Sequence, residues 1–394
     1  MKPSFYRLRN GIKNYAWGSR TALNTLFGVP NPDEQPQAEI WMGAHPAGCS
    51  EIEIGGDSVS LVEAIAQSPE AILGARTAEK FGQLPFLVKI LAAETALSIQ
   101  VHPDKRQAED GYAKQGDCIG DDYNDANHKP ELVYAITPFM AMNGFRPFQE
   151  TVNHFLRLNA QELMPALAEF RGNLTGEGFK HFFVSLMQLN PCEKESVLTQ
   201  LQACLDNGGF AHLQTFISLL MRDYPGDIGV LAPLFLHCVT LEPGDAMFLR
   251  AGTLHAYVHG TAVEVMASSD NVLRAGLTPK NINLPELVKC TVFSELQESE
   301  LRLSPDDTGT ERHYPVPVED FRFSVIEHCQ QKSVDVDSAQ ILLVLNGITI
   351  LRDMDGNEIT LYAGQSVFIP ALTGAYLLTQ NELSCLVQCG ISEA

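Results

Sequence analysis

Regularly spaced glycine turns near the C-terminal end are the feature that most constrains the fold of this sequence. Gly347, Gly356, Gly364 and Gly374 follow one another at intervals of 9, 8 and 10 residues, with short apolar segments between them. Turns at such intervals are typical of a sandwich or barrel of short antiparallel strands. The pattern therefore predicts a jelly roll over roughly residues 315–394.

A weak internal repeat extends this prediction to a second part of the chain. The segment 241–257 aligns with 361–376, with one residue of gap, and both share Leu-x-x-Gly, a central Phe and a closing Ala-Tyr. This turn-strand-turn-strand pattern resembles the cupin jelly roll, in which a histidine after the second turn is a metal ligand. Only the first copy keeps such a histidine, His255. The repeat thus predicts two cupin-like sandwiches, one with a metal and one without.

The middle of the chain has helical punctuation instead. Asn190 is suited to cap a helix with Pro191 at its first position, and Thr175 is suited to cap another. A third helix is predicted over Phe210 to Tyr224, before Pro225 and Gly226. We therefore predict a mainly β protein with an inserted all-α domain: a metal-bearing catalytic sandwich over 1–147 and 228–300, a helical insert over 148–227, and a metal-free sandwich over 301–394.

Composition limits the class of partner. The 394 residues include 48 acidic and 27 basic ones, for a net charge of -21, so nucleic acid is an unsuitable ligand. No apolar run is long enough to span a bilayer, and no apolar stretch follows the basic N-terminus, so we expect a cytoplasmic protein without a membrane partner. The nine cysteines include no Cys-x-x-Cys, which favours reduced, buried thiols.

Three separated segments offer groups that bind metals. Alternation along 97–102 puts Ser98, Gln100 and His102 on one face, although a half-exposed strand would show the same pattern. Glu131 follows a polar loop and begins an apolar strand, and His255 lies in the cupin-like turn. Two imidazoles, a carboxylate and an amide suit a divalent ion such as Zn²⁺. Glutamine is an uncommon zinc ligand, and its presence argues against an iron oxygenase.

The run from His255 to Lys280 carries further charged groups. Glu264 alternates with Val263 and Val265, so its side chain is expected to point into the sandwich. Arg274 and Lys280 are suited to hold a phosphate, with a planar fork and a point charge, or they are an ordinary surface pair. The spacing alone leaves both interpretations open.

These segments closely resemble the type I mannose-6-phosphate isomerase family. The family signature Tyr-x-Asp-x-Asn-His-Lys-Pro-Glu is intact at 123–131. It is accompanied by Asn-Tyr-Ala-Trp-Gly at 14–18, Ala-Glu-Ile-Trp-Met-Gly at 38–43, Leu-Ser-Ile-Gln-Val-His-Pro at 97–103 and the run 255–280. The resemblance covers the whole chain, and it is specific up to about Lys280 and loose in the helical insert and the last sandwich.

The resemblance implies a zinc-dependent interconversion of mannose 6-phosphate and fructose 6-phosphate, with one Zn²⁺ per chain. It also implies the fold predicted above, and we expect a monomer. The matching zinc ligands are Gln100, His102, Glu131 and His255, and the matching catalytic arginine is Arg274. Residues matching the family's substrate pocket are Trp17, Glu39, Lys89, Ser98, Lys129, Tyr257, Glu264, Asp270 and Lys280.

Such a reaction moves a proton between two carbons and shields an enediolate, which a Lewis acid and a guanidinium would stabilise. Three residues are eligible as the base, namely His128, Lys129 and Glu264, and the sequence does not choose among them. The phosphate is similarly open to Lys89, Lys129 and Lys280. Two other hypotheses remain at this stage, a sugar-binding module and a metal oxidase or dioxygenase, because one fold hosts many activities.

Overall fold

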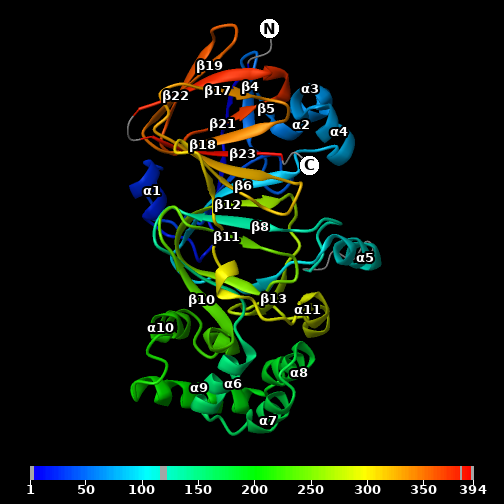
Figure 1. The fold of residues 1–394 in the computed structure, drawn as a ribbon, viewed down its shortest axis with the longest axis vertical. Helices are drawn as coiled ribbons and strands as arrows, with labels where there is room; N and C mark the ends of the chain where they lie inside the picture. The colour runs from blue at the N-terminus through cyan, green and yellow to red at the C-terminus, as the bar shows by residue number, and fades with distance from the viewer. Residues whose placement is uncertain (1–3, 116–121, 382–383, 392–394) are drawn as a thin grey trace.

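The computed structural model describes residues 4–115, 122–381 and 384–391. Three tiers follow one another along the long axis of the molecule (Figure 1). A C-terminal β-sandwich lies at one end, a first β-sandwich lies in the middle, and a cluster of helices forms the other end. The chain is therefore strand-rich with a separate helical region, as the sequence predicts.

The first sandwich is formed by strands that connect into one sheet path in the order β10-β9-β12-β6-β3-β2, with β7, β8, β11 and β13 joined to it at the sides. Its strands are β2 (Gly11–Lys13), β3 (Glu39–Met42), β6 (Phe86–Ala93), β7 (Ile99–Val101), β8 (Glu131–Ala135), β9 (Phe139–Phe145), β10 (Leu236–Leu241), β11 (Ala246–Leu249), β12 (His255–Ala267) and β13 (Leu273–Gly276).

Strand β12 belongs to both layers of this sandwich. Its first half, around His255, pairs with β7 and β9, and its second half, from Gly260 onward, pairs with β6 and β8. Gly260 has a φ of 118°, and a Cβ there would lie 2.5 Å from the Pro138 carbonyl oxygen, so a side chain would not fit. Residues far apart on one strand are thereby brought to opposite walls of one interior.

The C-terminal sandwich has two sheets, β1-β21-β18-β23-β16-β15-β14 and β17-β22-β19-β20. Its strands are β1 (Tyr6–Arg7), β14 (Asp306–Asp307), β15 (Glu311–Tyr314), β16 (Arg322–Glu327), β17 (Lys332–Asp335), β18 (Gln340–Asn346), β19 (Ile348–Asp353), β20 (Glu358–Tyr362), β21 (Ser366–Ile369), β22 (Ala375–Gln380) and β23 (Cys385–Gly390). The four predicted glycine turns all lie between these strands, and each glycine has a positive φ.

The two sandwiches pair their strands in the same way. In the first, β8 pairs with β11, and β9 pairs with both β10 and β12. In the second, β18 pairs with β21, and β19 pairs with both β20 and β22. The segments aligned as a sequence repeat are thus strands at equivalent positions in the two sandwiches. The single strand β12 makes the pairings that β22 and β23 make in the C-terminal sandwich.

A shared hydrophobic core joins the two sandwiches. Strands β6, β8 and β12 each turn alternate apolar side chains toward the C-terminal sandwich, among them Ile90, Leu132 and Val263. Phe323, Ile341, Val387 and further buried residues of the C-terminal sandwich meet them in the same cluster. The outer face of one layer of the first sandwich is therefore covered by the second sandwich.

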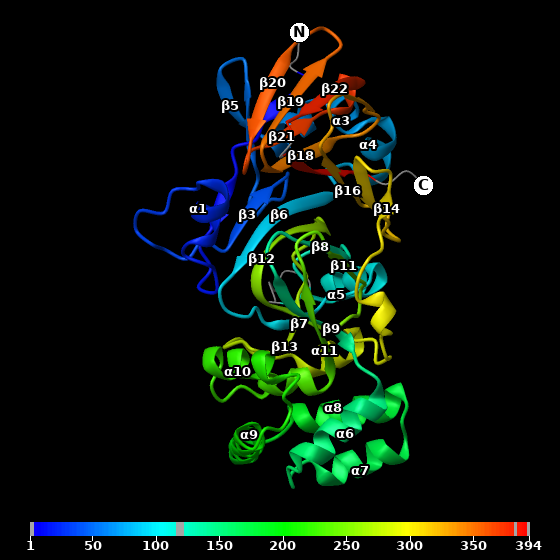
Figure 2. The same cartoon turned by 60° about the vertical axis from the view of Figure 1, so that its left-hand side comes forward.

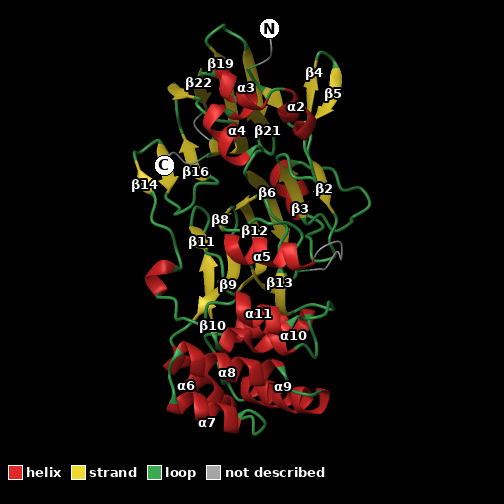
Figure 3. Ribbon diagram, turned by 90° about the vertical axis from the view of Figure 1, so that its right-hand side faces the viewer, coloured by secondary structure: helices red, strands yellow, loops and turns green. Residues whose placement is uncertain are grey.

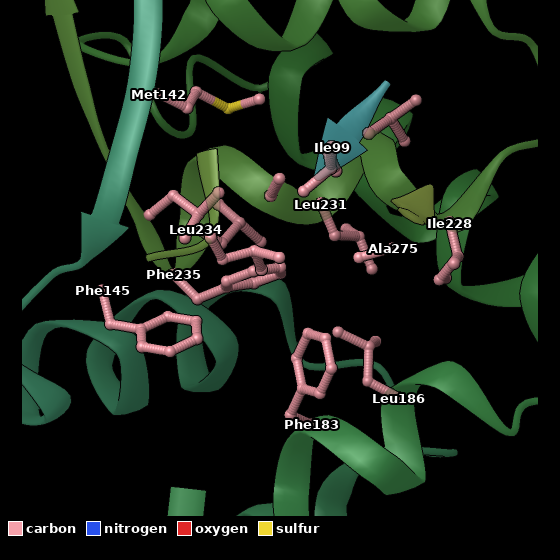
Figure 4. Packing of buried hydrophobic residues seen from close by; sticks show 14 of the residues in the cluster. Ile99, Met142, Phe145, Phe183, Leu186, Ile228, Leu231, Leu234, Phe235 and Ala275 are labelled. Atoms are coloured by element: carbon pink, nitrogen blue, oxygen red, sulfur yellow. The ribbon is translucent and has the colours of Figure 1, made fainter. Parts of the chain in front are cut away.

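The other layer of the first sandwich is covered by helices. Figure 4 shows Ile99, Met142 and Ala275 from the strands near Phe183, Leu186 and Phe235 of the helical side. The helices are α6 (Phe148–Leu158), α7 (Met164–Gly172), α8 (Gly176–Met187), α9 (Pro191–Asp206), α10 (Gln214–Asp223) and the short η1 (Ile228–Leu234). Between its two covers, the first sandwich holds a smaller apolar cluster that includes Leu91, Val133 and Tyr257, beside the buried polar residues of β6, β8 and β12.

The predicted helix caps are confirmed at α8 and α9. Thr175 accepts a hydrogen bond from the Gly178 amide, and Asn190 forms a capping box with Glu193. The helix predicted from Phe210 begins later, at Gln214, because Phe210 has a positive φ of 56° and its side chain is fully buried.

Smaller elements complete the fold (Figure 3). They are α1 (Ala22–Phe27), β4 (Glu51–Ile54), β5 (Asp57–Ser60), α2 (Leu61–Gln67), α3 (Pro69–Leu73), α4 (Ala75–Phe81), α5 (Lys105–Gln115), α11 (Leu284–Cys290), η2 (Glu298–Glu300) and η3 (Ala371–Thr373). Among the described helices, none is both long enough and apolar enough to cross a membrane. The cysteines in the described residues are free thiols, and Cys118 lies outside those residues.

The predicted domain boundaries remain a prediction, and one strand departs from them. Strand β1, from the start of the chain, pairs with β21 in the C-terminal sandwich. The Arg7 guanidinium also donates to the Thr360 carbonyl at 2.8 Å. The first described residues are thus part of a sheet that the rest of the chain completes only near its end.

Candidate active site

Strand register brings five predicted site residues into two rows. In β7, Gln100 lies opposite both His255 of β12 and Arg274 of β13. In the other layer, Glu264 of β12 lies opposite Lys89 of β6. Side chains directly opposite each other in antiparallel strands lie on the same face of the sheet. Figure 2 shows β6, β7 and β12 in the middle part of the molecule.

Three buried side chains meet as metal ligands would. The ligand atoms of His102, Glu131 and His255 all lie within 4.8 Å of one another. The Nε2 of His102 is 3.2 Å from Oε1 of Glu131, and the Nε2 of His255 is 3.4 Å from Oε2 of the same carboxylate. All three are almost completely buried.

Backbone carbonyls fix the state of both imidazoles. Nδ1 of His102 lies 2.6 Å from the Asn271 carbonyl, and Nδ1 of His255 lies 2.9 Å from the Thr253 carbonyl. A carbonyl accepts only, so each Nδ1 carries the proton and each Nε2 has a bare lone pair. Both Nε2 atoms are buried without a hydrogen-bond donor among the described residues. Two lone pairs facing a carboxylate fit a cation placed between them, and the donor set fits Zn²⁺.

The charges around these ligands favour cation binding. Burial, followed by the charge of Lys129, lowers the pKa of His102 to about 4, which keeps its ring neutral. Burial raises the pKa of the Glu131 carboxyl, but the charge of Lys129 is foremost among the effects that outweigh burial, and this pKa lies well below the usual range. The ligands are therefore in the protonation states that a metal requires.

Two lysines balance the buried carboxylates. The Lys129 ammonium lies 3.0 Å from Glu131, and the Lys89 ammonium lies 3.1 Å from Glu264 and 3.9 Å from Glu39. Burial lowers the pKa of Lys89, but Glu264 and Glu39 more than compensate, so its pKa lies above the usual value. Burial raises the pKa of the Glu264 carboxyl in spite of the charge of Lys89.

The remaining predicted residues are less uniformly placed. The Tyr257 hydroxyl donates to Glu131 at 3.1 Å, and the Asp270 carboxylate lies 3.5 Å from Nε2 of His45. Trp17 is half-buried and stacks on Tyr15. Ser98 is half-buried just before β7, Arg274 is half-buried in β13, and Lys280 is exposed between β13 and α11.

His128 lies apart from this group. Its Nε2 is 3.0 Å from both carboxylate oxygens of Asp320, a residue that precedes β16. Its side chain lines a separate cleft with Lys80, Lys105 and Ser268. The His128 ring thus contacts the C-terminal sandwich, whereas the Lys129 ammonium contacts Glu131 at the metal cluster. This placement removes the structural support for His128 as the catalytic base.

The sequence reasoning missed one buried organiser of the site, Asn271. Its side-chain oxygen accepts from the amides of Asn124 and Asp125 at 2.6 and 3.1 Å. Its side-chain nitrogen donates to the carbonyls of Asp125 and Asn127, each at 2.8 Å. With its own carbonyl on His102, Asn271 ties the loop before Glu131 to another ligand strand. The only sequence signal was its position beside Asp270, because the neutral amide of an asparagine does not by itself indicate a catalytic or metal-binding role.

Trp41 and His45 were also missed. The Trp41 indole donates to Glu39 at 2.6 Å, and the Lys89 ammonium lies 4.9 Å from the Trp41 ring centre. His45 packs edge-on against the same ring. Trp41 stands in a segment quoted for the resemblance, but an aromatic residue in a buried strand is more often part of a core.

Comparisons with known proteins agree on one family. Residues 5–148 match the model of the phosphomannose isomerase type I catalytic domain. The chain is 45% identical to mannose-6-phosphate isomerase from Salmonella typhimurium over 93% of this chain and 94% of that protein. It is 35% identical to the Homo sapiens mannose-6-phosphate isomerase over 88% and 89%. A zinc-bound crystal structure of mannose 6-phosphate isomerase superposes with a TM-score of 0.94 at 42% identity, covering 99% of this chain and all of that one.

Proposed function

This chain belongs to the type I phosphomannose isomerase family, and from that membership and its buried ionic cluster we propose how its residues divide the reaction. It interconverts mannose 6-phosphate and fructose 6-phosphate, and its cofactor is zinc. Family membership favours the isomerase over a sugar-binding module or a dioxygenase. The division of roles among residues is our proposal.

The proposed zinc ligands are His102, Glu131 and His255, with Gln100 as the fourth. Support for the first three is their buried convergence with bare ring nitrogens. Support for Gln100 is its place directly opposite His255. When bound, zinc supplies a Lewis acid that favours negative charge on sugar oxygens. Tyr257 holds one oxygen of Glu131 by its hydroxyl and so fixes how that carboxylate is presented.

Glu264 is the proposed general base. A base that takes the proton from C2 and returns it to C1 needs a pKa brought toward neutrality, and burial raises that of Glu264. Lys89, at 3.1 Å, orients the carboxylate and balances its charge when it is ionised. Lys129 is the alternative, but its ammonium is bound to Glu131. Raised pKa and position together favour Glu264.

Arg274 is the proposed partner of the enediolate. It lies opposite Gln100 in the adjacent strand, which places it next to the metal row. A guanidinium aimed at the oxygen where charge develops stabilises the transition state more than the sugar itself. For the phosphate we propose Lys280, because Lys89 and Lys129 already balance buried carboxylates while Lys280 is exposed. Trp17, Glu39, Ser98 and Asp270 are the proposed walls for the sugar.

The finer architecture belongs to the same proposal. We assign both sandwiches to the cupin type, supported by their equal strand pairings and by the histidine kept in only one of them. We also propose a cytoplasmic monomer that needs no nucleic acid or membrane as partner.

The test of the assigned roles begins with conversion of mannose 6-phosphate to fructose 6-phosphate by untreated, chelator-stripped and zinc-restored protein. Activity lost on stripping and regained with zinc supports the assigned metal role. In zinc-loaded protein, Glu264→Gln is then expected to lower kcat by about a hundredfold or more while zinc content stays unchanged. Near-normal turnover in folded Glu264→Gln would reject Glu264 as the base and leave Lys129.

A further inference from the structure

One contact links the C-terminal sandwich to the loop that carries the active site. Nε2 of His128 lies 3.0 Å from each carboxylate oxygen of Asp320. Asp320 is 5% exposed and stands just before β16, the strand that leads into the body of the C-terminal sandwich. His128 belongs to the irregular segment 122–130, which runs directly into Glu131 at the start of β8.

This segment, which we call the signature loop, is supported differently on its two sides. Asn271 holds the metal side through the four hydrogen bonds described above. The other side borders a cleft of about 580 Å³. A hydrated cleft offers no close packing to keep backbone in place. On that side, contacts between charged and polar groups must therefore keep the backbone of the loop in place.

The charges that line the cleft are already matched with partners. Lys80 contacts Glu319, and Lys105 donates to the Ala126 carbonyl at 2.9 Å. The Asp125 carboxylate, which also lines the cleft, accepts hydrogen bonds from the Asn127 and Asp270 amides at 2.8 Å each. Its relevance is the room that it leaves beside the loop.

The position of His128 makes its anchorage consequential. Lys129 follows His128 immediately, and Glu131 is two residues after Lys129. Because one planar peptide unit joins His128 to Lys129, a hold on His128 from outside restricts the backbone that places Lys129 and, through Pro130, Glu131. Their 3.0 Å contact lies at the proposed metal centre. Errors of about 1 Å in such groups cost up to about a hundredfold in rate.

We propose that Asp320 is a positioning residue, through which the C-terminal sandwich holds His128 and thereby places Lys129 and Glu131. This role rests on the proposed function, because its readout is isomerase turnover. It gives the metal-free sandwich a task in catalysis in addition to covering the first sandwich. Asp320 itself touches neither substrate nor metal in this scheme.

The experiment compares three variants of the full chain at saturating zinc and substrate. Asp320→Ala removes the acceptor for His128 and is expected to lower kcat by about tenfold to a hundredfold, with a smaller change in KM. Asp320→Asn keeps an acceptor oxygen and is expected to recover most of that loss. Glu319→Gln is the matched control, because it removes the neighbouring contact to Lys80 and is expected to leave kcat unchanged.

A contact that served stability alone would give another pattern. Asp320→Ala would then lower the thermal midpoint while kcat per folded molecule stayed at the wild-type value, and that result would overturn the proposal. Equal loss in Asp320→Asn and Asp320→Ala would also overturn it, since the acceptor would not matter. If Asp320→Ala does not fold, Asp320→Ser, whose hydroxyl is too short to reach Nε2, takes its place with the same expectations.

The wild-type protein separates this proposal from the one on which it rests. An inactive, zinc-loaded wild type would reject the proposed function and stop the comparison there. An active wild type with normal Asp320→Ala would reject only the positioning role.

Discussion

The two sandwiches pair their strands alike, yet at equivalent interior positions the first carries charged residues and the second carries uncharged ones. Register aligns Glu131 with Gln340, because each lies opposite the equivalent residue of the next strand, Leu249 or Ile369. The same register gives two further equivalent pairs, Glu264 with Gln388 and Lys89 with Ser324, and the sequence repeat aligns Tyr257 with Tyr376. Tyr257 donates to Glu131 at 3.1 Å, and Tyr376 donates to Gln340 at 3.2 Å.

This difference shows what each interior is built to do. In the C-terminal sandwich, the positions equivalent to Glu131 and Glu264 are linked by a hydrogen bond between uncharged groups, because Gln388 donates to Gln340 at 2.9 Å. In the first sandwich, Glu264 contacts Lys89 and Glu131 contacts Lys129. Glu131 also faces two bare imidazole nitrogens. Buried charges are costly to desolvate and are retained where a cation or a reaction uses them. The scaffold is common to both, and the function depends on a few charge-changing substitutions.

Making the first interior resemble the second should have the largest effect. Glu131→Gln replaces the shared carboxylate by the amide found at Gln340. Because a neutral amide does not balance the charge of Zn²⁺, we expect zinc affinity and turnover to fall by more than about a hundredfold. Elemental analysis after dialysis and the isomerase assay measure both.

The reciprocal change, Gln340→Glu, serves as the control. It is expected to leave zinc content and activity unchanged, and to lower stability because it buries a carboxyl with no equivalent of Lys129 beside it. A Glu131→Gln protein that kept full zinc through dialysis would show that charge is not the decisive difference.

The paired tyrosines sharpen the comparison with a smaller effect. Tyr257→Phe removes the hydroxyl that orients Glu131, and turnover is expected to fall by about tenfold. Tyr376→Phe removes the corresponding hydrogen bond to Gln340 in the C-terminal sandwich. It is expected to cost about 1 kcal/mol of unfolding free energy and to leave activity intact. Steady-state kinetics and thermal unfolding of both variants check this, and equal kinetic effects would contradict it.

Mild acid should distinguish the helical side from the C-terminal sandwich. Burial lowers the pKa of His154 and of His237, so their neutral rings are favoured in the folded state. As pH falls below about 6.5, the unfolded chain takes up these protons first, and stability is lost until the folded pKa values are reached. Hydrogen exchange at pH 7 and pH 5.5 should therefore show larger loss of protection in α6 and β10 than in β18 and β22. A matched loss in both regions would argue against this cause.

Local signals were sufficient for much of the fold and of the metal site. Asn190 and Pro191 specify a helix start through backbone groups within one turn, and the glycine turns specify strand ends in the same way. Glu131 could be predicted because its motif is contiguous. The late start of α10 could not, because Phe210 gains more from burial in the helical core than from helix formation.

Long-range partners were the part that the sequence did not reveal. His128 lies in the most specific motif of the chain, yet its partner Asp320 is 192 residues away in the other sandwich. Asn271 acts through backbone atoms of a distant loop, and such acceptors have no residue type to recognise. Motifs therefore identified which residues belong to the site, and only the structure shows which way they face.

The pairing of β1 with β21 has a consequence for how the protein is made. Arg7 contacts Gln365, a partner 358 residues later in the chain. At about 5–20 residues per second, a ribosome supplies that partner only after tens of seconds. During that interval β1 is outside the ribosome without its partner β21, and the sheet that contains both strands is incomplete. Folding of this sheet can be completed only after β21 has been synthesised, although the active-site residues are synthesised well before.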